Sequence, residues 1–237
     1  MIIFMWSGPR NLSTALMRSF ENRKDTIVLD EPFYSYYLNK TGLKHPMYKE
    51  IIKTYSIDEN KIIKKITKIP KDHKIFYQKH MTHHILEINN LEWLNMGKNC
   101  FLIRHPAKVI NSYLKKNNLT NIRDIGFKKQ FDIFQYVRKN FDLNPIIINS
   151  DDILKNPKKI LKKLCDNLKI EFNASMTNWP KGARESDGIW GLVWYEKVNN
   201  STSFEKYSES TLDVPKKYYD IYNECLEIFH HMNEFAL

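Results

Sequence analysis

Short apolar runs separated by segments of helical pattern organise the first 170 residues of the chain. The first run, residues 2–6 (IIFMW), shows no apolar/polar alternation, which is typical of a strand buried on both faces in a parallel sheet. Comparable runs predict four more strands, at residues 26–29, 74–79, 99–103 and 145–148. Apolar residues at helical spacing predict helices that start at residue 11 or 13 and near residue 33, and others at residues 107–116, 127–140 and 157–168.

Strands that alternate with helices in this way predict an α/β fold, with three α/β/α layers around a parallel sheet of about five strands. We interpret residues 40–72, which are polar, lysine-rich and weakly helical, as a helical insertion in a single domain that spans residues 1–237. Residues 174–204 hold three of the five tryptophans, placed between glycines, and this predicts an ordered loop that closes over a site. Residues 215–235 have the pattern of one amphipathic helix.

The turn after the first predicted strand has the features of an anion-binding site. Gly8 and Pro9 break the apolar run, Arg10 lies in the turn, and the hydroxyls of Ser13 and Thr14 follow at the expected start of a helix. The unpaired amides and the dipole of a helix N-terminus attract anions, so this turn is suited to a phosphate or a sulfate. An ordinary strand-to-helix turn with a surface arginine is the alternative.

Four singular side chains fall at the carboxyl ends of predicted strands: Arg10, Glu31, His80 and Arg104. In open parallel sheets, ligands bind beyond the carboxyl ends of the strands. The shared position of these four residues therefore predicts one site at that edge of the sheet. Aromatic residues near residues 33–37 and 190–194 suggest a small pocket with apolar or cation-facing walls.

Two motifs in this sequence resemble those of the PAPS-dependent sulfotransferases, whose donor PAPS is 3′-phosphoadenosine 5′-phosphosulfate. The 5′-phosphosulfate loop of that family is usually written P-[RK]-S-G-T-[TS]; residues 9–14 here read PRNLST, with Asn11 and Leu12 in place of Ser-Gly. A second family motif, R-[DNH]-P with a serine eight residues after the arginine, matches Arg104 and Ser112. The Asp-Glu-Pro-Phe sequence at residues 30–33 is similar to that of bacterial small-substrate members.

This resemblance implies a P-loop-like fold and transfer of a sulfuryl group from PAPS to a hydroxyl or amine of a small-molecule acceptor. The product of the donor would be adenosine 3′,5′-bisphosphate (PAP). The resemblance implies that the first turn holds the 5′-phosphosulfate through the residues Gly8, Pro9, Arg10, Asn11, Leu12, Ser13 and Thr14. Arg104 and Ser112 would bind the 3′-phosphate. A late basic segment that contains Lys181, Gly182 and Arg184 weakly resembles the family segment that touches the same phosphate.

The chemistry of sulfuryl transfer requires charge stabilisation on the leaving phosphate and a base for the acceptor. Arg10 is the candidate for the first role. Glu31 and His80 are both candidates for the base, and we favour Glu31, which precedes an aromatic helix. Lys79, next to His80, is available to the transferring group. The alternatives are a helix-capping carboxylate for Glu31 and a hydrogen-bonded loop histidine for His80.

Composition adds limits on partners and location. The formal net charge is +10, but the lysines are scattered among Asn and Ile, which gives weak support for an anionic ligand and does not predict a nucleic-acid partner. Three widely spaced cysteines, with no C-x-x-C, favour reduced thiols in the cytoplasm. No run of eighteen apolar residues and no signal peptide is seen, so we expect no membrane association.

Other classes of protein fit the sequence less well. A P-loop kinase is disfavoured because G-x-x-x-x-G-K-[ST] is absent. The histidine pairs at residues 83–84 and 230–231 have no third ligand at suitable spacing, so no metal site is predicted. A non-catalytic relative that binds PAPS or another nucleotide stays open, because Asn11 and Leu12 depart from the family loop.

Overall fold

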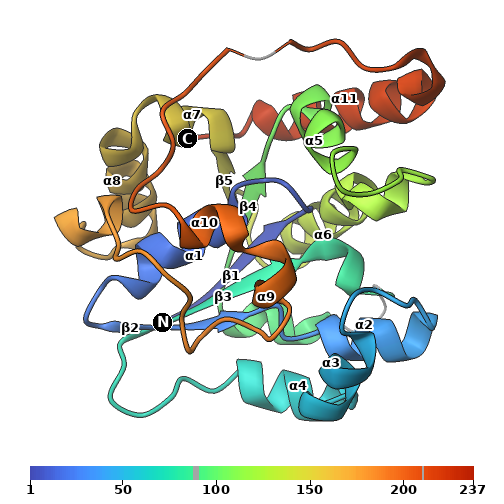
Figure 1. Cartoon of the computed structure of the whole chain (residues 1–237). Helices are drawn as coiled ribbons and strands as arrows, with labels where there is room; N and C mark the ends of the chain where they lie inside the picture. Colours follow the sequence, from blue (N-terminus) through green and yellow to red (C-terminus); the bar gives the residue numbers. More distant parts are fainter. Residues whose placement is uncertain (88–90, 210) are drawn as a thin grey trace.

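The protein is described here by a computed structural model that covers residues 1–87, 91–209 and 211–237. In these residues, five parallel strands form one sheet in the order β2-β3-β1-β4-β5 (Figure 1). Each of the five predicted runs forms one strand, and helices cover both faces of the sheet, so the predicted α/β fold class is confirmed. The strands are β1 (Ile2–Ser7), β2 (Thr26–Asp30), β3 (Ile75–Met81), β4 (Lys98–Ile103) and β5 (Ile146–Asn149).

Helices connect the strands and extend beyond them. The α-helices are α1 (Ser13–Glu21), α2 (Tyr34–Thr41), α3 (Tyr48–Thr54), α4 (Glu59–Ile66), α5 (Pro106–Tyr113), α6 (Phe127–Asn140), α7 (Ser150–Lys155), α8 (Pro157–Leu168), α9 (Gly191–Trp194), α10 (Glu196–Asn199) and α11 (Tyr219–Asn233). The short 3-10 helices are η1 (Thr82–His84), η2 (Glu92–Met96), η3 (Ile122–Ile125), η4 (Ala174–Thr177) and η5 (Lys216–Tyr218). The last long helix begins at residue 219 rather than 215, because the backbone of Pro215 is extended (ψ 135°) and η5 intervenes.

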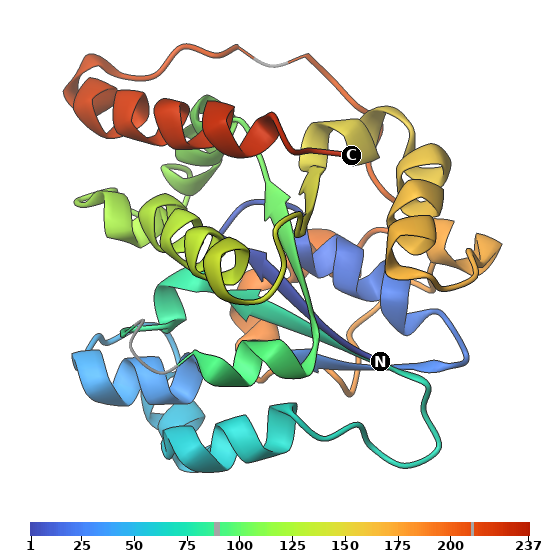
Figure 2. The ribbon, with the colours of Figure 1, turned by 180° about the vertical axis from the view of Figure 1, so that it is seen from behind.

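The central strand β1 divides the hydrophobic core into two layers, because successive side chains of a strand point to opposite faces. Ile3 and Met5 pack with residues of α1 and α8 on one face. Phe4 and Trp6 pack with residues of α6 and α11 on the other face. Figure 2 shows α6 and α11 on one side of the sheet and α1 and α8 on the other. Burial on both sides explains why β1 is apolar throughout.

The segment predicted as a helical insertion contains α3 and α4. Ile62 and Ile66 of α4 pack into the larger core layer, beside the edge of the sheet. Ile51 of α3 instead packs with Trp190 and Tyr195, which come from the segment predicted to close over a site. These contacts join residues 40–72 to the rest of the domain through apolar side chains.

Residues 174–204 contain η4, α9 and α10 and are held to the domain by buried charges. Arg18 of α1 forms an ion pair with Asp187 at 2.7 Å and donates a hydrogen bond to Asn199 Oδ1 at 3.2 Å. As a result α10 lies beside α1, at the carboxyl end of the sheet (Figure 1). Within the described part of the chain, no helix has both the length and the apolar character that crossing a bilayer requires.

Candidate active site

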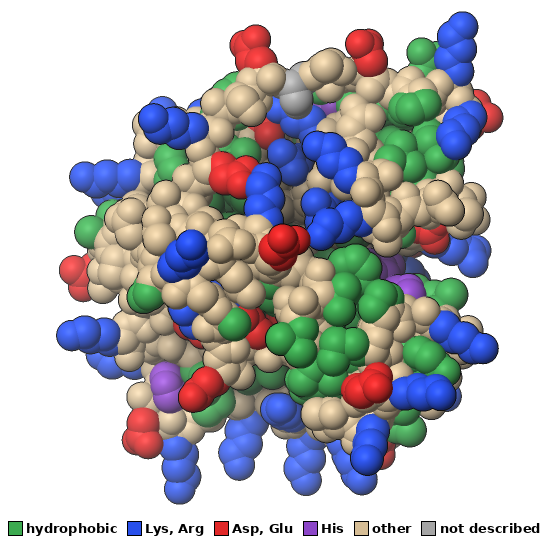
Figure 3. Space-filling model, viewed as in Figure 1, with side chains coloured by type: hydrophobic (Ala, Val, Ile, Leu, Met, Phe, Trp, Pro, Cys, Tyr) green, Lys and Arg blue, Asp and Glu red, His purple; other side chains and the backbone are tan. Residues whose placement is uncertain are grey.

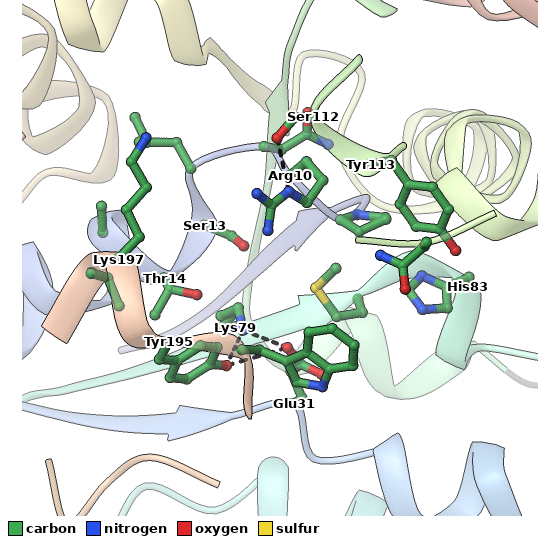
Figure 4. Close-up of a pocket in the computed structure, with 18 of the residues that line it drawn as sticks. Arg10, Ser13, Thr14, Glu31, Lys79, His83, Ser112, Tyr113, Tyr195 and Lys197 are labelled. Carbon is green, nitrogen blue, oxygen red and sulfur yellow. Dashed lines mark hydrogen bonds and ion pairs between the residues drawn. The ribbon is translucent and has the colours of Figure 1, made fainter. Parts of the chain in front are cut away.

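A cavity of about 480 Å³ lies at the carboxyl ends of the central strands. The first turn contributes residues 9–15 to its lining, and the ends of β2 and β3 contribute Glu31 and Lys79. Arg104 and Ser112 line it from the end of β4 and from α5, and Trp194, Tyr195, Lys197 and Val198 line it from the segment that contains α9 and α10. Figure 4 shows these groups facing one space from several elements, although they are far apart in the sequence.

The turn between β1 and α1 has the backbone shape of a loop that wraps around an anion. Arg10 (φ 65°) and Leu12 (φ 69°) are both left-handed, a conformation that non-glycine residues rarely adopt. Asn11 stabilises this shape, because its Nδ2 donates to Gly8 O at 3.1 Å and its own carbonyl accepts from Ser150 Oγ at 2.8 Å. No side chain caps the N-terminus of α1, so its first amides are available to a ligand in the cavity.

Gly8 has a packing role in this turn and does not line the cavity. A Cβ atom at this position would lie 2.3 Å from the carbonyl oxygen of Ile125, which is too close for any larger residue without movement of the backbone. The positive φ angles of the turn belong to Arg10 and Leu12 and not to Gly8. Gly8 therefore allows the backbone of Ile125 to approach the turn closely, and it does not provide the unusual backbone angles of the turn.

The two predicted phosphate-binding arginines meet in the structure. Arg10 Nε donates to Ser112 Oγ at 2.9 Å, and Arg104 donates to the carbonyl oxygen of Arg10 at 3.0 Å. Burial, and then the positive charge of Arg104, lower the pKa of Arg10. Among the described residues, Arg104 Nε is buried without a hydrogen-bond partner, and the Asp151 carboxylate lies 3.8 Å away. The positive charges of these two adjacent guanidinium groups are only weakly balanced by the Asp151 carboxylate, so together they suit an anionic ligand.

A buried ionic cluster lies on the opposite side of the cavity (Figure 4). Lys79 Nζ, in a residue only 1% exposed, donates to Asp30 Oδ1 at 3.0 Å, to Glu31 Oε1 at 2.5 Å and to Tyr195 Oη at 2.6 Å. Tyr195 Oη in turn donates to Asp30 Oδ2 at 2.7 Å, and Asp30 Oδ2 accepts from the amide of Gly188 at 3.2 Å. All three protons of the Lys79 ammonium group are thus engaged.

Burial shifts the acid–base behaviour of this cluster. It raises the pKa of Glu31, an effect that Lys79 opposes and Asp30 reinforces. Burial alone would lower the pKa of Lys79, but the charges of Asp30 and Glu31 outweigh it and hold that pKa above its usual value. Glu31 is therefore a carboxylate with raised basicity beside a permanently charged lysine. Its backbone is left-handed (φ 39°), a strained conformation of the kind that is concentrated at functional sites.

His80 does not reach the cavity, which corrects its assignment as a candidate base. It is 1% exposed, its Nε2 lies 3.1 Å from Gln78 Oε1, and its ring lies 4.5 Å from that of Trp6. Burial lowers the pKa of His80 to about 3. The physical reason is the strand period of two: Lys79 points toward the cavity, so its neighbour points into the opposite core layer. Of the two candidate bases, Glu31 alone lines the cavity.

The late basic segment also lies outside the cavity lining, contrary to the expectation for Lys181, Gly182 and Arg184. Lys181 is exposed, and the amide of Gly182 (φ 116°) donates to Asn199 O at 2.8 Å. The guanidinium of Arg184 turns back onto carbonyl groups of its own loop and lies 3.6 Å from the Glu21 carboxylate. Four residues slightly later in the chain line the cavity instead, with one charged group among them: Trp194, Tyr195, Lys197 and Val198.

The remaining wall of the cavity is aromatic. The ring of His84 stacks between those of Tyr34, at 4.6 Å, and Tyr37, at 4.9 Å. Tyr113 and Trp194 also line the cavity. Among the aromatic residues expected near a pocket, Phe33 and Trp190 are instead buried beneath this wall.

Several lining residues carried no recognisable signal in the sequence. Tyr195, His84 and Asp124 fit no motif, and each reaches the site only through tertiary contacts. Asp30 is different, because its position at the end of a predicted strand beside Glu31 is itself a signal. Within the residues that the structure describes, no group of three or more His, Cys, Asp and Glu side chains is arranged to hold a metal ion.

Positive side chains gather around the hollow on this face of the molecule, with hydrophobic and histidine side chains below them (Figure 3). A parallel α/β sheet, a helix N-terminus and paired arginines at the strand ends are features that suit a phosphate- or sulfate-bearing ligand. The chain matches the sulfotransferase domain family over residues 1–236 and belongs to that family.

Two curated relatives are similar to the chain in sequence. The chain is 33% identical over 228 residues to branched-chain-amino-acid aminotransferase-like protein 2 of Arabidopsis thaliana, and 32% identical to protein 1 of that name. It covers 40% and 41% of these two proteins, so it spans about two fifths of the curated relatives that it matches.

Solved sulfotransferase structures have the same fold at low sequence identity. The sulfotransferase domain of the Synechococcus PCC 7002 olefin synthase aligns with a TM-score of 0.57 at 15% identity, over 97% of this chain and 94% of that one. Mouse sulfotransferase SULT7A1, solved in complex with PAP, aligns with a TM-score of 0.53 at 16% identity, over 100% and 89%. The sulfotransferase domain from the curacin biosynthetic pathway also gives 0.53, at 17% identity, over 100% and 91%.

Proposed function

We propose that this chain transfers a sulfuryl group from PAPS to a hydroxyl or amine of a small molecule. The observation that carries the proposal is the pair of partly buried guanidinium groups, Arg10 and Arg104, beside the uncapped N-terminus of α1. Membership of the sulfotransferase family supports the reaction type. The PAP bound to the mouse relative supports PAPS as the donor.

On this proposal, the donor lies along the side of the cavity that is uppermost in Figure 4, where Arg10 and Ser112 are labelled. The first turn and the free amides of α1 bind the 5′-phosphosulfate, because these groups carry positive potential toward the cavity. Arg104, whose Nε has no hydrogen-bond partner among the described residues, binds the 3′-phosphate with Ser112. Arg10 stabilises the charge that develops on the leaving phosphate as the reaction proceeds.

The acceptor side of the proposal rests on Glu31. A new bond forms between the acceptor oxygen or nitrogen and the sulfur atom, the bond from sulfur to the phosphate oxygen breaks, and Glu31 takes the acceptor proton. Burial raises the pKa of Glu31, which makes its carboxylate a better proton acceptor than an exposed glutamate. Lys79 keeps Glu31 ionised and oriented through the 2.5 Å contact. Lys79 therefore acts on Glu31 and does not contact the sulfuryl group, because the protons of its ammonium group are already hydrogen-bonded within the cluster.

The donor assignment is tested by thermal shift and calorimetry with PAP, using ATP with Mg²⁺ as the comparison ligand. A ligand at one hundred times its dissociation constant stabilises the folded state by about 2.7 kcal/mol. Arg104→Ala is expected to weaken PAP binding at least tenfold, because it removes a charge-assisted contact at a partly buried site. Arg184→Ala is the matched control outside the cavity, and its PAP affinity is expected to equal that of the wild type.

Each alternative function predicts a different outcome of the same assay. Stronger stabilisation by ATP with Mg²⁺ than by PAP would overturn the sulfotransferase proposal and favour a kinase. PAP binding without release of PAP from PAPS in the presence of any acceptor alcohol or amine would identify a non-catalytic relative. Equal losses in Arg104→Ala and Arg184→Ala would refute the assignment of the 3′-phosphate site.

A further inference from the structure

The two sides of the cavity differ in charge. Arg10 and Arg104 line the side assigned to the donor, together with Lys197, whose charge is paired with the Glu205 carboxylate at 2.8 Å. On the aromatic side, the described lining residues include the carboxylates of Glu31 and Asp124, and the Lys79 ammonium group there is fully engaged by the buried cluster. This side therefore carries net negative charge in a chain whose formal charge is +10.

The histidines of the aromatic wall do not change this balance, because they are neutral. Burial lowers the pKa of His83 to about 3 and also lowers the pKa values of His45 and His84. The packing explains why: His84 is 2% exposed and stacked between two tyrosine rings, and the ring nitrogen Nδ1 of His45 lies 2.9 Å from the Tyr34 hydroxyl. Among the described residues that line this wall, Lys79 is then the one cation, and it is paired with Asp30 and Glu31.

Asp124 is held in place at the far end of the wall by three hydrogen bonds. Its Oδ2 accepts hydrogen bonds from the amide of Thr120 at 2.9 Å, from the Thr120 hydroxyl at 2.9 Å and from the amide of Asn121 at 3.0 Å. Burial together with the Asp124 charge raises the pKa of Tyr113 to about 12, so the carboxylate acts on the same space that Tyr113 faces. Figure 4 shows Tyr113 beside His83 on this side of the cavity.

His84 supplies an independent sign that this wall receives a ligand. Its Nδ1 is buried and has no hydrogen-bond partner among the described residues, and it lies 4.0 Å from Glu31 Oε2. A polar group of a ligand that lies between Glu31 and His84 would give His84 Nδ1 a hydrogen-bond partner. The Tyr113 ring, which lines the cavity beyond it, suits a cation or an aromatic ring, and the Asp124 carboxylate favours the cation.

From this arrangement we propose that the acceptor is a small hydroxyl compound that also carries an ammonium group. Its hydroxyl lies at Glu31 and His84, and its ammonium group lies at the Tyr113 ring near Asp124. A carboxylate-bearing acceptor is excluded by repulsion from Glu31 and Asp124. This inference rests on the proposed sulfotransferase function, because Glu31 locates the reacting hydroxyl.

Three phenols of matched size provide the test: tyramine, which carries an ammonium group, 4-ethylphenol, which is neutral, and 4-hydroxyphenylacetate, which carries a carboxylate. Their affinities for the protein saturated with PAP are measured by calorimetry, and release of PAP from PAPS is measured with each. Tyramine is expected to bind at least about tenfold more tightly than 4-hydroxyphenylacetate, with 4-ethylphenol between them. Equal affinities, a preference for the carboxylate, or no binding of tyramine overturns the proposal.

Variants identify the charge that sets this preference. Asp124→Asn keeps an acceptor oxygen for the Thr120 and Asn121 bonds and removes the charge, so the preference for tyramine should fall several-fold while affinity for 4-ethylphenol is unchanged. Asp220→Asn, an exposed change in α11, is the matched control and should keep the full preference. Tyr113→Leu gives a second readout, since loss of the ring face should weaken tyramine more than 4-ethylphenol. An Asp124→Asn protein with the wild-type preference refutes the assignment.

The same measurements separate this inference from the proposed function. A protein that does not bind PAP contradicts the sulfotransferase proposal itself. A protein that binds PAP and shows no preference for the ammonium compound contradicts only the acceptor class.

Discussion

The buried cluster around Lys79 allows a prediction that needs no knowledge of the acceptor. Lys79→Met keeps an unbranched side chain that is one atom shorter and removes its charge, which leaves the carboxylates of Asp30 and Glu31 buried without a cation. Removing one partner of a buried ion pair typically costs about 3–5 kcal/mol, because the remaining charge is uncompensated. For a domain of this size, that loss corresponds to a fall in melting temperature of about 6–20 °C.

The loss should depend on pH in a defined direction. Burial raises the folded-state pKa of Glu31 above its unfolded value of about 4.3. The folded state is therefore more stable when the Glu31 carboxyl group is protonated. This stabilisation is present below the unfolded pKa and is lost as pH rises through the folded pKa. Lys79 opposes the shift in the wild type, so its removal raises the pKa of Glu31 further and enlarges the effect. The difference between wild type and Lys79→Met should therefore be small near pH 4 and grow toward pH 8.

Urea unfolding of both proteins at several pH values measures this difference. The double variant Lys79→Met with Glu31→Gln should recover part of the lost free energy at pH 8, because it removes one of the two buried carboxylates. Lys116→Met is the matched control, since Lys116 is 46% exposed and its ion pair with Glu196 is 3.8 Å long. That surface change should cost less than about 0.5 kcal/mol. A loss below about 1 kcal/mol in Lys79→Met at pH 8, or one that does not vary with pH, refutes the reasoning.

Two further predictions concern catalysis and packing. Glu31→Gln should lower the rate of PAP release from PAPS by about a hundred- to ten-thousand-fold, the usual contribution of a general base, while calorimetry shows unchanged PAP affinity; a rate within threefold of the wild type would show that another group accepts the proton. Gly188→Ala should lower the free energy of unfolding by about 1–3 kcal/mol in urea titration, because its Cβ would lie 2.1 Å from the Trp190 ring and the loop must shift; an unchanged midpoint and slope would contradict this packing.

The sequence by itself determined the fold class and the position of Arg10 and Arg104 at one edge of the sheet. Both depend on local patterns: apolar runs followed by helical spacing specify a buried strand and then a helix, and a parallel sheet gathers the carboxyl ends of its strands at one edge. Arg10 and Arg104 could therefore be assigned to one site across 93 intervening residues, because each follows a predicted strand and fits a family motif.

Tertiary structure alone decided which neighbouring side chain faces the cavity. Lys79 and His80 lie in a strand that is buried on both faces, so no polarity pattern shows which of them points toward α1, where the first turn places the ligand site. The same limit applies to Arg184, which satisfies its charge within its own loop and against Glu21. The local sequence shows that a charged residue is present. The direction in which its side chain points depends on the groups that pair with it in the folded protein.

The acceptor side of the cavity was also beyond the sequence. Tyr195 reaches Asp30 and Lys79 only because Arg18 and Asp187 hold the segment of α9 and α10 against α1. Asp124 and His84 meet Tyr113 and Tyr34 through packing between helices that are separate in the chain. Contacts of this kind have no fixed spacing in sequence, because they depend on how the long connections fold over the strand ends. The periodic pattern of the chain thus specified the scaffold, and the packing of its irregular segments specified the chemistry at the acceptor side.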